Sequence, residues 1–105
     1  MPRTRKQKGV GFAAEMYEGH DGTTAVHVPF DPREVWDAAP AAIVIGRSKK
    51  PRKAHLVRGT VNGVAFESAI WFYFRNFVMI IDPAVRKAAK AKPGDTVEIV
   101  VELRG

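Results

Sequence analysis

Basic residues cluster in one short stretch of this chain. Five of them fall within seven positions, namely Arg47, Lys49, Lys50, Arg52 and Lys53. Such a cluster can neutralise the phosphates of a nucleic acid without reading its base sequence. The more common role of a charge run is a solvated surface loop. We therefore carry these five residues as a candidate polyanion-binding site, with a solvated loop as the alternative.

The segment WFYFRNF, further along the chain, is rich in aromatic side chains. Trp71, Tyr73 and Phe74, with Arg75 beside them, could stack on exposed bases next to the basic residues. A small-ligand pocket near Phe74, Arg75 and Asn76 is another candidate. The alternative is that the rings fill the core, and exposed rings would fit dimerisation as well as ligand binding. Whether the rings face solvent beside the basic stretch decides between these interpretations.

No other group of residues has the spacing of a catalytic or metal site. The histidines at positions 20, 27 and 55 are far apart and lack clustered carboxylates, so we expect surface or edge histidines. Ser48 lies in the charged stretch, and Ser68 has no nucleophile elbow around it. The segment GVGFAA opens a predicted strand, where a dinucleotide-binding motif would open a helix. We therefore expect no enzymatic activity, no metal and no other cofactor.

The composition of the 105-residue chain is that of one small domain. The absence of cysteine excludes disulfides and thiol chemistry, and it is compatible with a reducing cell interior. No apolar run approaches the roughly 18 residues that a membrane helix needs, and the basic N-terminus lacks the apolar core of a signal peptide. The net charge of +6 favours contact with polyanions. We expect a cytoplasmic protein with a basic flexible tail, residues 1–8, and a single domain, residues 9–105.

The dipeptide Asn62-Gly63 gives the clearest structural signal. It lies between two runs of β-forming residues and suits a two-residue type I′ hairpin turn. The turn sets a register whose facing pairs are Val61 with Val64, Thr60 with Ala65, Gly59 with Phe66, Arg58 with Glu67 and Val57 with Ser68. One face of the hairpin is then apolar, and the other carries the opposite charges of Arg58 and Glu67. The ring of Phe66 would cover the bare backbone of Gly59.

Strands and two short helices account for the remaining chain. Alternating apolar and polar residues predict strands at residues 10–17, 24–30 and 96–103, and a continuous apolar run predicts another at residues 77–81. Asp31-Pro32 and Asp82-Pro83 are each typical of a helix start, with the aspartate as the cap. Residues 41–45 fit either a short strand or an apolar connection. Residues 47–53 are expected to form a charged loop, and residues 72–76 an aromatic connection.

The two Asp-Pro helix starts lie 51 residues apart, about half the chain. The order of elements around them is β-β-α-β twice, which chance or a true duplication explains equally well. We predict a mainly β fold, a small closed β-barrel of about six strands with two short helices and an internal duplication, because closure removes exposed sheet edges.

Five segments of the sequence resemble a bacterial family, the domain of unknown function 1905. They are GFAAEMYEG, VPF, RGTVNGVAFESAI, DPAVRKAAK and KPGDTVEIVVEL, and the resemblance spans Gly9 to Leu103. The resemblance implies a closed, duplicated barrel of the double-split type, a fold group that includes swapped-hairpin DNA-binding dimers. The family carries no established activity, so the resemblance implies no catalytic residue. The segments SKKPRK and WFYFRNF depart from the family pattern.

We therefore expect a non-enzymatic binding or accessory domain that is a monomer or a homodimer, has no membrane association and has an unidentified partner. Weak, sequence-independent nucleic-acid binding through the basic loop and the aromatic segment is one alternative. A small-ligand pocket at the barrel mouth is the other.

Overall fold

A long two-stranded hairpin lies at the centre of the sheet. The computed structural model describes three segments, residues 9–19, 23–44 and 50–104. Strands β5 (Arg52–Val61) and β6 (Val64–Tyr73) pair antiparallel through the turn Asn62-Gly63, in which both residues have positive φ. All five predicted facing pairs are confirmed. The turn dipeptide was therefore sufficient to set the register of the hairpin.

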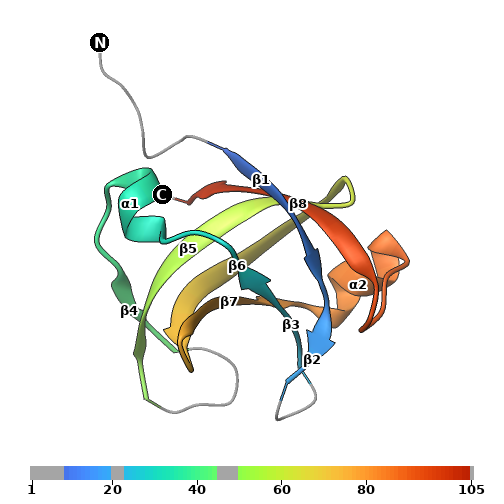
Figure 1. Cartoon of the computed structure of the whole chain (residues 1–105), viewed down its shortest axis with the longest axis horizontal. Helices are drawn as coiled ribbons and strands as arrows, with labels where there is room; N and C mark the ends of the chain where they lie inside the picture. The colour runs from blue at the N-terminus through green and yellow to red at the C-terminus, as the bar shows by residue number, and fades with distance from the viewer. Residues whose placement is uncertain (1–8, 20–22, 45–49, 105) are drawn as a thin grey trace.

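The other strands pair antiparallel around this hairpin (Figure 1). The strands are β1 (Val10–Glu15), β2 (Tyr17–Glu18), β3 (Thr24–Val28), β4 (Ala41–Ile43), β7 (Asn76–Ile81) and β8 (Thr96–Leu103), and the helices are α1 (Pro32–Trp36) and α2 (Pro83–Ala89). The strand order is β1-β8-β5-β6-β7-β3-β2, and β4 pairs with the first residues of β5. The predicted strands are confirmed, with ends that differ by a few residues. Neither helix has the length and apolar character that would let it cross a membrane.

The sheet curls strongly but does not close, so the prediction of a closed barrel of about six strands is wrong. The described residues form an eight-stranded half-barrel in which β2 and β4 have only two and three residues. No ladder joins β1 to β2 or β3 within the described residues. Side chains fill the gap instead. The ring of Phe12 packs edge-on against Phe30, and Phe30 packs edge-on against the buried Trp36, with centroids 5.8 and 5.5 Å apart.

The structure does not show the predicted duplication. The strand that follows α1 is β4, which has three residues and lies off the main path of the sheet. The strand that follows α2 is β8, which has eight residues and lies between β1 and β5. The two halves of the chain therefore place their last strands in different positions.

The two helix starts differ in their caps. Asp31 caps α1, because its Oδ1 accepts a hydrogen bond from the backbone N–H of Arg33 at 2.9 Å. Asp82 occupies the equivalent position before α2 but makes no side-chain cap bond, so the cap predicted there is wrong. Val85 and Ala89 still fix α2 by packing against the core.

Apolar side chains from the long strands fill the concave side of the sheet. The buried cluster comprises Met16, Val26, Val28, Trp36, Val57, Val61, Phe66, Ile70, Met79, Ile81, Val97, Ile99 and Val101. On the convex side the predicted Arg58–Glu67 ion pair does not form, although the two residues face each other. Arg58 binds Glu102 instead, and Glu67 binds Arg104, at 2.9 and 2.8 Å.

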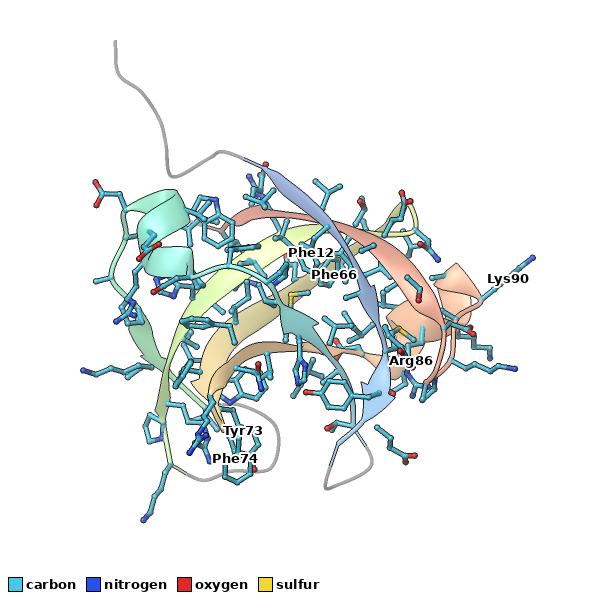
Figure 2. The ribbon with its side chains drawn as sticks, viewed as in Figure 1. Phe12, Phe66, Tyr73, Phe74, Arg86 and Lys90 are labelled. Atoms are coloured by element: carbon cyan, nitrogen blue, oxygen red, sulfur yellow. The ribbon has the colours of Figure 1, made fainter. Side chains whose placement is uncertain are left out.

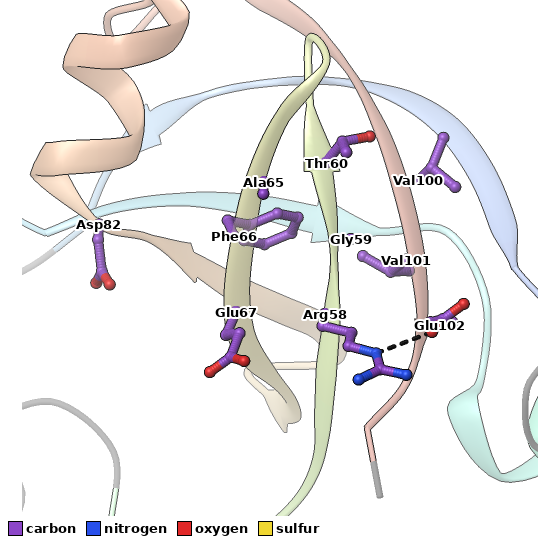
Figure 3. A pocket seen from close by; sticks show the side chains of 10 residues that line it. All are labelled: Arg58, Gly59, Thr60, Ala65, Phe66, Glu67, Asp82, Val100, Val101 and Glu102. Carbon is purple, nitrogen blue, oxygen red and sulfur yellow. Dashed lines mark hydrogen bonds and ion pairs between the residues drawn. The ribbon is translucent and has the colours of Figure 1, made fainter.

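The backbone of β8 lies very close to Gly59 of the neighbouring strand β5. A Cβ atom built on Gly59 would lie 1.7 Å from the carbonyl oxygen of Val100 and 2.9 Å from the Cα of Val101. No side chain can fit at such distances, so the backbone of β8 occupies the volume that any other residue would need. Phe66 is buried directly opposite, and Figure 3 shows its ring extending toward Gly59, as predicted.

We expect Gly59→Ala to lower the free energy of unfolding by about 3 kcal/mol, because the added methyl group must push β8 away from β5. Urea denaturation would measure the loss. Gly11→Ala is the matched control, because a Cβ there would meet its nearest atoms at ordinary distances of 3.7 and 3.8 Å. Equal stabilities of the two variants would contradict this account of the curl.

Candidate nucleic-acid interface

The residues of the predicted basic site that the structure describes lie at the start of β5 or just before it. Lys50, Arg52 and Lys53 are exposed. Arg52 and Lys53 begin the strand, so the prediction of a charged loop over residues 47–53 is wrong for these two residues. They pair there with β4, whose Ile43 faces Arg52 and whose Ala42 faces Lys53. The edge strand thus holds both basic residues in extended backbone.

Two of the predicted basic residues, Arg47 and Lys49, lie outside the described residues, as does the predicted tail at residues 1–8. Their place in the candidate site stays a prediction.

The aromatic segment forms the second hairpin of the sheet and is not a connection. Strand β6 continues through Tyr73, a two-residue turn contains Phe74 and Arg75, and β7 begins at Asn76. The rings differ in exposure. Phe72 and Phe74 are 59% and 72% exposed. Trp71 and Tyr73 are half-buried, and Arg75 is exposed. Some rings of the segment are therefore exposed to solvent, and others are partly buried.

The sheet register brings the basic and aromatic residues together. Ala54 of β5 faces Trp71 of β6, so the residues that begin β5 lie beside those that end β6. The guanidinium carbon of Arg52 lies 5.6 Å from the centre of the Tyr73 ring, within the range of a cation–π interaction. The Tyr73 and Phe74 rings are 4.3 Å apart. Figure 2 shows these two rings together at one end of the molecule, far from Arg86 and Lys90.

The two faces of the β6–β7 hairpin carry separate ring pairs. Phe72 faces Phe77 across the ladder, and their rings meet edge-on at 5.0 Å. Tyr73 is the next residue along β6, so its side chain points to the opposite face. Rings are thus offered on both faces of the hairpin.

Two further residues of this end were not predicted from the sequence. The rings of Tyr17 and His27 lie 4.9 Å apart on the neighbouring strands β2 and β3. Burial raises the pKa of Tyr17, and electrostatic interaction with Tyr73 raises it further. Alternation along residues 10–17 put Tyr17 on the outer face of its strand, but only the strand order places it near β6. We name Arg52, Tyr73, Phe74, Tyr17 and His27 the aromatic–basic cluster.

Trp71 is less suited to stacking than its neighbours. Its indole nitrogen is buried and makes no hydrogen bond with the described residues. A half-buried ring whose polar edge faces inward presents little surface to a base. We keep Trp71 as a support for the cluster and not as a contact.

A separate open groove of about 620 Å³ crosses β6, β5 and β8 (Figure 3). Its lining residues are Arg58, Gly59, Thr60, Ala65, Phe66, Glu67, Asp82, Val100, Val101 and Glu102. Phe74, Arg75 and Asn76 do not line it, so the pocket predicted beside them stays a prediction. Three of its charged residues, Arg58, Glu67 and Glu102, are engaged in exposed ion pairs, which contribute little to stability.

Within the described part of the chain, histidine and carboxylate side chains form no group that could hold a metal. His27 is exposed, as expected. His55 is buried, contrary to the expectation of a surface or edge position, and its Nε2 donates to the carbonyl oxygen of Ala38 at 2.8 Å. This bond ties β5 to the segment between α1 and β4.

The raised pKa of Tyr17 predicts a loss of stability in base. The folded state favours the neutral phenol, so the stabilisation is complete below the ordinary tyrosine pKa of about 10 and is lost as pH rises through the higher folded pKa. We expect wild type to lose more stability than Tyr17→Phe between about pH 9 and pH 11, measured by urea denaturation. Equal losses would show that Tyr17 does not titrate differently in the folded state.

Comparison with known proteins places the chain in one family. Residues 12–101 match the family described as Domain of unknown function (DUF1905). A search of curated proteins finds no match. The match covers most of the described sheet, including the Gly59 crossing and the second hairpin. The chain belongs to the DUF1905 family, as its segments suggested.

Proposed function

We propose that this domain binds nucleic acid without base-sequence specificity through the end of the sheet that carries the aromatic–basic cluster. We further propose that it acts by binding and not by catalysis. The observation that supports the proposal most directly is the position of Arg52 over the ring of Tyr73, beside the exposed Phe74. Cationic side chains that track a phosphate backbone, with aromatic rings for its bases, are the usual components of such sites.

The charges at this end support the same proposal. Lys53 and Arg75 are exposed near the cluster, and among the described residues neither of them, nor Arg52, makes an ion pair with a carboxylate. By contrast, Arg33, Arg58 and Arg104 are each paired. Cations that are not neutralised by the protein itself are available to replace the counterions of a nucleic acid.

The test is binding of fluorescent single-stranded and duplex oligonucleotides across a salt series, with two triple variants. The first is Lys50→Gln, Arg52→Gln and Lys53→Gln. The matched control is Lys87→Gln, Lys90→Gln and Lys92→Gln, three exposed lysines on and just after α2, at another side of the molecule (Figure 1). Both variants lower the formal net charge equally, so a difference between them reports on position and not on overall charge.

We expect log Kd for wild type to rise linearly with log salt, and the first variant to flatten the slope by about 0.7 per lost contact on single strands and about 0.9 on duplex. The control should keep the wild-type slope. Equal slopes in both variants would remove the β5 residues from the proposal. Failure of wild type to bind either oligonucleotide at about 50 mM salt, where phosphate contacts are strongest, would end the proposal.

A further inference from the structure

The chain makes two tight hairpin turns of the same kind from very different residues. Asn62-Gly63 and Phe74-Arg75 both have positive φ at each position, with values of 48° and 84° in the first turn and 48° and 71° in the second. Asparagine and glycine adopt this left-handed backbone at little cost. A bulky residue such as phenylalanine rarely does, because its Cβ crowds the following carbonyl.

Burial of the Phe74 ring does not explain its presence at the turn. The side chain is 72% exposed, so most of its apolar surface remains in water. Asn76 donates to the backbone oxygen of Phe74 at 3.3 Å, a contact that any residue at position 74 would permit. Phe74 therefore combines two unfavourable features, a strained backbone and an exposed aromatic ring, at the tip of a hairpin. Strained residues of this kind concentrate at functional sites.

We infer that Phe74 is a base-stacking contact and that the ligand of this site is single-stranded nucleic acid. The inference rests on the proposed function and deepens it. In a duplex the faces of the bases are covered by the neighbouring bases, so an exposed aromatic ring at a hairpin tip cannot stack on them. In a single strand each base can leave the stack and lie on an aromatic ring.

The surroundings of Phe74 fit this ligand. The Tyr73 ring beside it and the Arg52 guanidinium over Tyr73 continue the platform along one face of the hairpin. Phe72 and Phe77 form a second ring pair on the other face. Arg75, the other residue of the turn, is exposed and supplies a cation next to Phe74 in the chain, as a contact to a phosphate would require.

The experiment compares three ligands of equal length, about 12 nucleotides per strand. They are an oligothymidylate, an abasic single strand and a duplex. The abasic strand keeps the phosphates and removes the bases. We expect wild type to bind oligothymidylate about tenfold more tightly than the abasic strand, the size of effect that one stacked base gives. Phe74→Tyr should keep this ratio, and Phe74→Leu should bring it close to one.

A fourth protein tests the strain separately. In it Phe74→Asn and Arg75→Gly give the second turn the residues of the first. We expect its melting temperature to rise by about 4 °C while its preference for oligothymidylate over the abasic strand is lost. A melting temperature at or below that of wild type would overturn the claim that Phe74 is held against a backbone cost.

The remaining outcomes separate the inference from the proposed function. Equal binding of oligothymidylate, abasic strand and duplex by wild type, or an unchanged ratio in Phe74→Leu, would overturn base stacking and leave a phosphate-binding domain. Absence of binding to all three ligands at low salt would overturn both.

Discussion

The close approach of β8 to Gly59 is the constraint on which the rest of the fold depends. The carbonyl of Val100 occupies the volume in which a side chain at position 59 would have to lie. The absence of a side chain at Gly59 lets the β8 backbone lie close to β5, and the sheet curls around the buried cluster without closing by hydrogen bonds. Phe12, Phe30 and Trp36 fill the opening that remains between β1 and β3. A side chain at position 59 would push β8 away from β5 and disturb the packing of that core.

The same geometry assembles the candidate site. A hairpin of two ten-residue strands places the first residues of β5 beside the last residues of β6, although they are about twenty positions apart in the chain. The curl then brings β2 and β3 around to the same end, where Tyr17 and His27 lie. The pairing register of the strands, and not a dedicated loop, therefore brings the basic side chains next to the aromatic rings. A site built on paired strands is held more rigidly than one on a free loop.

The sequence was most informative where local chemistry decides the structure, although the cap predicted at Asp82 is wrong. Asn62-Gly63 specified its turn and register, and Asp31-Pro32 specified a capped helix. Prediction failed where distant strands decide. Phe74-Arg75 is a poor turn sequence, so nothing local indicated that it joins two strands. Alternation of apolar and polar residues cannot show that β1 and β3 do not pair with each other. It also cannot show that Arg58 forms its ion pair with Glu102 and not with Glu67, or that Tyr17 lies near Tyr73. The basic and aromatic residues were found, but their contact was not.

The most direct test of the central claim is a nuclear magnetic resonance titration of the isotope-labelled protein with an oligothymidylate. Amide shifts report which residues meet the ligand without any substitution. We predict that the largest changes fall on the first residues of β5 and on the β6–β7 turn at Phe74 and Arg75, with little change in α2. Changes confined to the groove beside Arg58 and Glu102, or spread evenly over the charged surface, would contradict the claim that the aromatic–basic cluster is the binding site.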